Sequence, residues 1–294
     1  MTLVPPLPFL LLAACIVAVW LPPLRWRGRA WPAWPLLMAA AAVTGWAGGW
    51  IGPIGIAATA MLAALLWAAH HLALSAWRGA CTLAAALLVL ALALHAVPGF
   101  VPWVPVARAQ LSADAQPLRL ALHADAALAA ALAVAAWGRR VSGWREAAMV
   151  LRQALPVAAA TTTLVLLLAW AMGVVRPDAL WQPAVPDWAA LHLLRMGLVT
   201  CVLEEAFFRG LIQQRLATRL AHRRGGTAMA VAAASLLFGL AHAPGGAAYM
   251  LLAMLAGVGY GWALQRTGRI EAAIAAHFVL NATHFIGFSY PRLA

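Results

Sequence analysis

Long apolar runs follow one another along almost the whole chain, separated by short polar or Pro-rich stretches. About 20 helical residues are needed to cross the hydrocarbon core of a bilayer. The runs are rich in Ala and Leu and show no period-2 alternation, which excludes a transmembrane β-barrel. The pattern predicts an all-α fold, a polytopic transmembrane bundle of about ten helices: 3–20, 34–51, 54–77, 79–97, 119–138, 155–174, 188–215, 226–242, 247–265 and 271–288.

The composition agrees with a membrane protein. Hydrophobic residues make up 65% of the 294 residues and charged residues only 10%, too few to cover the surface of a soluble domain. The formal net charge of +12 rests on Arg alone, because the chain has no Lys. No basic soluble domain is available to carry a nucleic-acid footprint, so we expect contacts with membrane lipids and no nucleic-acid partner.

Arg residues concentrate in alternate loops, as the positive-inside rule expects of cytoplasmic loops. Both termini then lie on the outer side of the membrane. An Ala-rich chain with Arg in place of Lys is typical of a high-GC bacterium, so we expect a multi-pass protein of the bacterial inner (plasma) membrane. The Arg residues assigned to the inside are Arg25, Arg27, Arg29, Arg78, Arg139, Arg140, Arg145, Arg152, Arg215, Arg219, Arg223, Arg224, Arg266 and Arg269.

Polar groups inside apolar runs become frequent after about residue 186. We therefore predict an N-terminal transmembrane helical scaffold over 1–186 and a catalytic helical core over 187–294. In the scaffold, His123 and Asp125 lie in the fifth run, where they either line a cavity or form a buried hydrogen-bonded pair.

Glu204, Glu205 and Arg209 occupy one apolar run. Ionisable groups in a membrane span are costly and usually face the protein interior. Glu205 and Arg209 are four residues apart on a helix, so they should form an ion pair. Glu204 then points about 100° away. A carboxyl in a low-dielectric site has a raised proton affinity, which suits it to accept a proton from water. The alternative is that both Glu residues are structural.

Two further pairs have the same spacing of four residues. Phe238 lies one turn before His242, and His277 lies one turn before Asn281. An Asn amide buried in a membrane protein can donate a hydrogen bond to a developing oxyanion. The alternative interpretation is that His242, His277 and Asn281 only make interhelical hydrogen bonds.

The three motifs follow one another on successive predicted helices: Glu204-Glu205-x-x-Phe208-Arg209-Gly210, Phe238-Gly239-Leu240-Ala241-His242 and His277-x-x-x-Asn281. In this order they resemble the CPBP family, the CAAX prenyl endopeptidase type II-like and bacteriocin-processing membrane proteases that carry the Abi domain. The resemblance spans roughly 188–288. It implies an intramembrane endopeptidase that cuts a peptide bond near a membrane anchor.

The resemblance also implies roles for individual residues. Glu204 and His242 would hold and activate the water, while His277 and Asn281 would stabilise the tetrahedral oxyanion. The supporting residues would be Glu205, Arg209 and Phe238. Simple helix counting puts Glu204 near mid-depth and His242 near the end of its helix, so an irregular turn at Pro244 or a helix tilt has to bring them together.

Cofactor use is open at this stage. Glu204, His242 and His277 form a possible zinc set of one carboxylate and two imidazoles. The same groups can hold water directly, as in a glutamic-type protease, and no His-Glu-x-x-His helix is present. We expect the metal-free mechanism.

Prenylated C-terminal motifs are a eukaryotic feature, so we expect a membrane-anchored protein or peptide as the substrate. Two other functions remain as alternatives: a non-catalytic binding, bacteriocin-immunity or scaffold protein, and a proton-coupled transporter.

Overall fold

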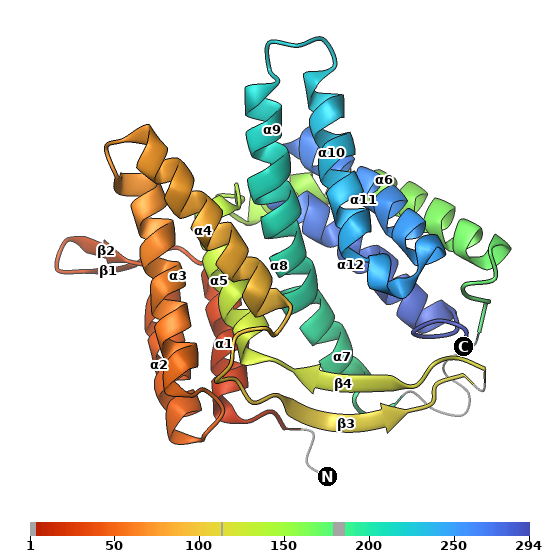
Figure 1. Ribbon diagram of the computed structural model, residues 1–294, viewed down its shortest axis with the longest axis horizontal. Helices are drawn as coiled ribbons and strands as arrows, with labels where there is room; N and C mark the ends of the chain where they lie inside the picture. Colours follow the sequence, from red (N-terminus) through yellow and green to blue (C-terminus); the bar gives the residue numbers. More distant parts are fainter. Residues whose placement is uncertain (1–3, 113, 179–185) are drawn as a thin grey trace. The chain divides into compact units, whose positions relative to one another are not determined.

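The computed structural model describes residues 4–112, 114–178 and 186–294 (Figure 1). Helices make up 69% of the structure, which confirms the prediction of an all-α bundle. Within the described residues, each apolar run of the sequence contains at least one helix. Leu3, the predicted start of the first helix, lies outside the described residues.

The chain forms two compact units. The first unit comprises Met1–Pro105, Ala121–Trp137 and Leu198–Leu203, and the second comprises Val106–Leu120, Gly138–Gly197 and Glu204–Ala294.

In the first unit, α1 packs against α2 and α3 packs against α4, while α5 contacts α1, α3 and α4 (Figure 1). Helix α5 consists mainly of Ala and is buried over almost its whole length. Such small side chains allow neighbouring helices to approach closely without leaving cavities. The helices are α1 (Leu7–Ala18), α2 (Trp34–Ala47), α3 (Pro53–His71), α4 (Ser75–Ala93) and α5 (Ala124–Trp137).

Two short two-stranded sheets interrupt the helices. β1 (Leu24–Trp26) and β2 (Arg29–Trp31) form an antiparallel hairpin, and β3 (Trp103–Ala109) pairs with β4 (Leu118–Leu122). The predicted start of the fifth helix at residue 119 is therefore wrong, since α5 begins at Ala124. The reason is local: buried Leu118, exposed Arg119 and buried Leu120 alternate with the period of a strand.

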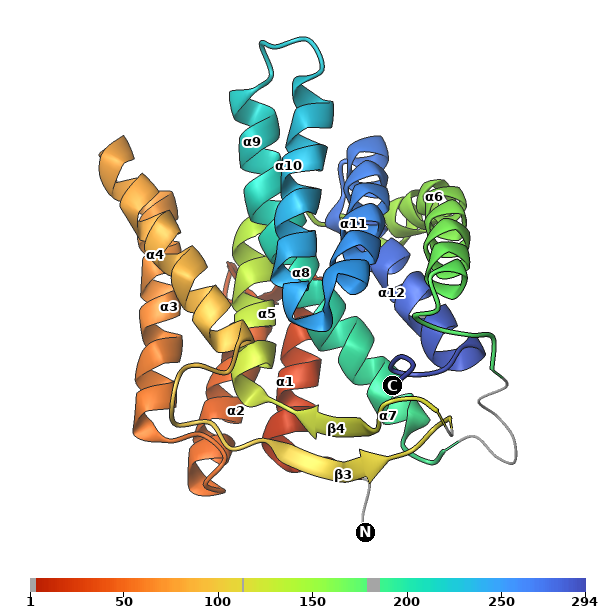
Figure 2. The same ribbon diagram turned by 45° about the vertical axis from the view of Figure 1, so that its right-hand side comes forward.

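In the second unit, α11 packs against α6, α10 and α12, and α6 also packs against α12 (Figure 2). One continuous helix, Ala189 to Arg219, passes through two π-helical segments and belongs to this unit except for Leu198–Leu203. The elements are α6 (Trp144–Ala171), α7 (Ala189–Arg195), η1 (Met196–Cys201), α8 (Val202–Glu205), η2 (Ala206–Gln213), α9 (Gln214–Arg219), α10 (Gly226–Ala241), the 3-10 turn η3 (Ala243–Gly245), α11 (Ala247–Thr267) and α12 (Ile270–Gly287).

Glycines on α11 allow the close packing of this unit. A Cβ atom at Gly259 would lie 2.0 Å from Thr161 Oγ1 of α6, and one at Gly257 would lie 2.9 Å from Arg209 Nη2. Both distances are shorter than real carbon contacts, so any larger residue would push α6 or the Arg209 side chain away. The sequence Gly257–Gly261 thus determines how closely α11 approaches its neighbours.

Five helices of the described chain are long and apolar enough to cross a membrane: α3, α4, α6, α11 and α12. Helices α1, α2, α5 and α10 are also apolar but shorter, with 10–17 residues. Large side chains such as Trp67 and Leu83 point outward with more than 60% of their surface exposed, as expected of lipid-facing positions. The chain is an integral membrane protein with several spans.

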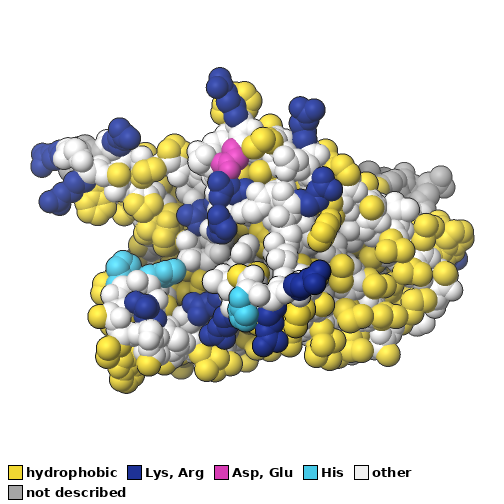
Figure 3. All heavy atoms as spheres, turned by 90° about the horizontal axis from the view of Figure 1, so that it is seen from above, with side chains coloured by type: hydrophobic (Ala, Val, Ile, Leu, Met, Phe, Trp, Pro, Cys, Tyr) yellow, Lys and Arg dark blue, Asp and Glu magenta, His cyan; other side chains and the backbone are white. Residues whose placement is uncertain are grey.

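Arg side chains gather on the face of the second unit that carries the α9–α10 connection (Figure 3). Arg215, Arg219, Arg223 and Arg224 are exposed there. This cluster belongs to the loops that the positive-inside rule assigns to the cytoplasm.

Topology mapping tests the predicted orientation. Reporter fusions or cysteine labels placed after Arg29, Arg140 and Arg224 should report the cytoplasm, and a fusion after Ala294 should report the opposite side, because Arg-rich loops stay inside. A cytoplasmic signal at Ala294 would show that the predicted number of spans is wrong.

Candidate active site

Glu204 and Glu205 end the short α8, which lies between the π-helical segments η1 and η2. A π turn contains an extra residue, which changes the direction of the side chains that follow, and such turns often occur at functional sites. The helix over 188–215 was predicted from its apolar run. Its π turns were not predicted, because residue type gives no clear signal for them.

Glu205 is fully buried, and its two carboxylate oxygens face Arg209 and His277. Its Oε2 lies 3.1 Å from Arg209 Nε, an ion-pair distance without the alignment of a hydrogen bond. Its Oε1 lies 2.8 Å from His277 Nδ1, which brings α12 next to the first motif. The predicted pair between Glu205 and Arg209 is confirmed. The contact with His277 was not predicted, since it joins residues 72 positions apart.

Arg209 is also fully buried, and its charge has several compensating contacts. Nη2 donates a hydrogen bond to Gly257 O at 2.9 Å. The guanidinium lies 4.5 Å from the ring centroid of Phe238 and 5.3 Å from that of Tyr260, within cation–π range. A buried charge is tolerated only when its partners are in place, so Arg209 depends on Glu205.

The His277 ring has a fixed orientation. Glu205 holds Nδ1, and Tyr260 stacks on the ring with centroids 4.5 Å apart and an angle of 14°. Phe238 contacts the same ring edge-on at 5.8 Å. Nε2 therefore faces Glu204 Oε2 at 3.9 Å, too far for a direct hydrogen bond.

Glu204 differs from its neighbour in exposure. Its side chain is 27% exposed, whereas that of Glu205 is 0% exposed. Glu204 Oε2 itself is buried and has no hydrogen-bond partner among the described residues. Buried acceptors are almost always satisfied, so an orphan carboxylate oxygen beside an imidazole is typical of a site that binds something further.

His242 follows the last residue of α10 and is half-buried. Its Nδ1 lies 2.8 Å from Phe238 O, so Nδ1–H donates there and Nε2 is the ring nitrogen left for other contacts. The ring packs 4.6 Å from Phe238, whose other contacts include His277. The turn η3 over Ala243–Gly245 follows, at the position where an irregular turn was predicted.

The remaining predicted residue, Asn281, lies half-buried on α12 one turn after His277.

Two tyrosines contact the candidate site and were not predicted from the sequence. Tyr260 stacks on His277, and Tyr249 contacts the His242 ring at 5.7 Å. A signal was available, since the chain has only three Tyr and Tyr260 lies between glycines inside an apolar run.

A pocket of roughly 340 Å³ lies in the second unit beyond His242. Gly245, Gly246, Tyr249 and Arg292 are among its lining residues. Tyr249 lines this pocket and also packs against His242, with ring centroids 5.7 Å apart, so the pocket adjoins His242. Arg292 donates a hydrogen bond to Gly245 O and is held at the pocket rim.

A family model described as Type II CAAX prenyl endopeptidase Rce1-like matches residues 186–283, about a third of the chain. This stretch contains all three motifs, and the match confirms the resemblance that they indicated. The match supports a CAAX-type intramembrane protease as the general class of protein. No curated protein and no solved structure matched the chain.

The two neighbouring carboxylates should differ in their effect on stability. Glu205→Ala leaves Arg209 buried without its anion, which typically costs about 3–5 kcal/mol. Glu204→Ala removes only the longer, partly exposed contact with His277 Nε2 at 3.9 Å and should cost about 1 kcal/mol or less. Equilibrium unfolding in detergent micelles measures both. Adding Arg209→Met should recover part of the loss in Glu205→Ala, and equal losses in the two single variants would contradict the assignment of Glu205 as the structural carboxylate.

Proposed function

We propose that the chain is an intramembrane endopeptidase that hydrolyses a peptide bond of a membrane-anchored protein or peptide with a directly activated water. The contrast between the two carboxylates supports this most strongly. Glu205 is fully buried and engaged with Arg209 and His277 at 3.1 and 2.8 Å, whereas Glu204 is partly exposed and its Oε2 has only the longer contact of 3.9 Å with His277 Nε2. One carboxylate is thus structural and the other is available for chemistry.

In this proposal, Glu204 is the general base. It takes a proton from the water while the water oxygen forms a bond to the scissile carbonyl carbon. His242 accepts the second hydrogen of the same water at Nε2, since its Nδ1–H is used by Phe238 O. When the tetrahedral intermediate collapses, the C–N bond breaks and Glu204 returns the proton to the leaving nitrogen.

The oxyanion is stabilised by His277 and Asn281. Glu205 accepts from His277 Nδ1–H, and in this proposal the ring also carries a proton on Nε2, which donates to the developing negative charge. Asn281, one turn further along α12, supplies its amide N–H as a second donor. Both donors come from one rigid helix, which keeps their spacing fixed during the reaction.

A zinc alternative would use Glu204, His242 and His277. Tetrahedral zinc with bonds of about 2.0–2.2 Å holds its ligand atoms roughly 3.4 Å apart. The 3.9 Å between Glu204 and His277 suits such an ion. Among the described residues, the set that converges closely enough to hold an ion is another one, and the set with His242 is not assembled in that way. We therefore favour the metal-free, glutamic-type mechanism.

The substrate segment would enter through the pocket beside His242, where Arg292 offers a positive charge to the peptide or to a lipid phosphate. The catalytic core would be residues 187–294, supported by packing of α6 against α11 and α12, and residues 1–186 would be the scaffold. The Ala-rich composition with Arg and no Lys favours the bacterial inner membrane as the location.

Replacement of the proposed base gives the most direct test of this function. Glu204→Gln keeps the shape of the side chain but cannot accept the proton, so cleavage of a membrane-anchored peptide should fall by about 10²–10⁴-fold. The measurement is turnover by purified, folded protein. Substrates for the assay come from comparing membrane proteomes of cells with the wild-type protein and with the Glu204→Gln variant. Normal turnover by Glu204→Gln would show that Glu204 is not the base.

Asn281→Ala should lower kcat by about 10²–10³-fold with little change in KM, because its hydrogen bond forms only as negative charge develops. Asn281→Asp should be at least as damaging, since an ionised carboxylate repels the oxyanion. Steady-state kinetics on the same peptide measures both variants. A raised KM with unchanged kcat would mean that Asn281 binds the substrate and not the transition state.

A further inference from the structure

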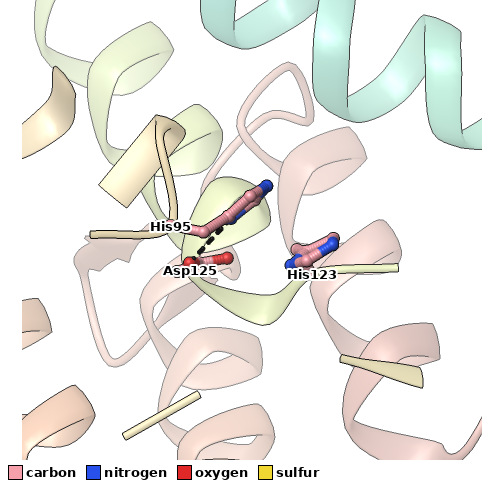
Figure 4. A group of neighbouring side chains, drawn as sticks. All are labelled: His95, His123 and Asp125. Atoms are coloured by element: carbon pink, nitrogen blue, oxygen red, sulfur yellow. Dashed lines mark hydrogen bonds and ion pairs between the residues drawn. The ribbon is translucent and has the colours of Figure 1, made fainter. Parts of the chain in front are cut away.

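A second cluster of ionisable residues lies in the first unit, outside the stretch matched by the family model. His95, just after α4, meets His123 and Asp125 at the start of α5 (Figure 4). One nitrogen from each imidazole and one carboxylate oxygen all lie within 4.8 Å of one another. Asp125 and His123 were predicted either to line a cavity or to form a hydrogen-bonded pair. His95, which was not part of that prediction, lies with Nδ1 2.9 Å from Asp125 Oδ2.

From this convergence, we propose that His95, His123 and Asp125 bind a divalent first-row transition metal ion of the zinc type. Imidazole nitrogen and carboxylate oxygen are the donors that such ions prefer over the all-oxygen ligands of Ca²⁺ and Mg²⁺. Three protein ligands also leave at least one position for water.

The distances suit an ion after a small rearrangement. His95 Nδ1 and Asp125 Oδ2 are 2.9 Å apart, close to the separation of two ligand atoms on one ion. The upper limit of 4.8 Å for the set exceeds the roughly 3.4 Å of tetrahedral zinc by an amount that side-chain rotation can supply. The metal would take the place of the proton that His95 and Asp125 share.

The second observation is how strongly the structure holds this cluster. The Asp125 side chain is 2% exposed, and its Oδ1 accepts a hydrogen bond from Ala126 N at 2.7 Å, which orients the carboxylate. His95 adopts φ +56°, a left-handed conformation that costs free energy in residues other than Gly. Strain of this kind persists where the surroundings require it, often at ligand sites.

The two imidazoles stack with centroids 3.7 Å apart and an angle of 18°. The His95 side chain is 41% exposed, which gives an ion a route into the site.

An ion at this position would fasten the end of α4 to the start of α5. His95 and His123 bracket residues 96–122, which include β3 and β4. A metal that closes a long loop stabilises the folded state, because it binds the native arrangement and not the unfolded chain. The proposed role is therefore structural and independent of the Glu204 centre.

Zinc binding by the full-length protein tests this inference. Purified protein in detergent is stripped with a chelator and titrated with Zn²⁺ by calorimetry, and Co²⁺ absorption reports the coordination. His95→Gln and His123→Gln should bind at least about 10–100-fold more weakly than wild type. His71→Gln, an exposed histidine of α3 in the same unit, is the matched control and should bind as wild type. His277→Gln should also retain this binding.

Circular dichroism and size-exclusion chromatography confirm that each variant is folded. His95→Gln is the decisive variant, because a partly exposed residue is replaced without opening the core. Wild-type affinity in folded His95→Gln and His123→Gln would overturn the proposal. So would the absence of saturable Zn²⁺ binding by the folded wild-type protein.

Discussion

The second unit depends on one buried carboxylate. Glu205 faces Arg209 on its own helix and His277 on α12, and all three side chains are almost completely removed from solvent. An unpaired charge in this environment would be strongly destabilising, so the three residues must be satisfied together. The contact fixes α12 against η2, and it fixes the direction in which the His277 ring presents Nε2.

The chemistry that we propose follows from this constraint. Because Glu205 is committed to Arg209 and His277, the adjacent Glu204 is the carboxylate that remains for proton transfer. Aromatic rings enclose the cluster: Tyr260 stacks on His277 and Phe238 lies against Arg209. These rings exclude water from the ion pair and thereby strengthen it. Preorganised polar groups in a dry surrounding are what stabilisation of an oxyanion requires.

The sequence allowed prediction of features that depend on local spacing. Helical periodicity and apolar run length identified the helices, and the spacing of four residues identified the pair of Glu205 with Arg209. Contacts that depend on tertiary packing were not accessible, such as Glu205 with His277 or His95 with Asp125. The π turns beside Glu205 and the close approach at Gly257 were also missed, because the spacing of residue types along one helix carries no clear signal for either.

Glu205 is expected to act on the reaction through His277. A double-mutant cycle on kcat measures this coupling, with Glu205→Gln and His277→Ala made singly and together and each rate normalised to folded protein. The two effects should be strongly non-additive: once His277 is removed, Glu205→Gln should have little further effect on kcat. If the two losses in kcat multiply as independent effects, Glu205 does not act by orienting His277, and the proposed division of roles between the two carboxylates is wrong.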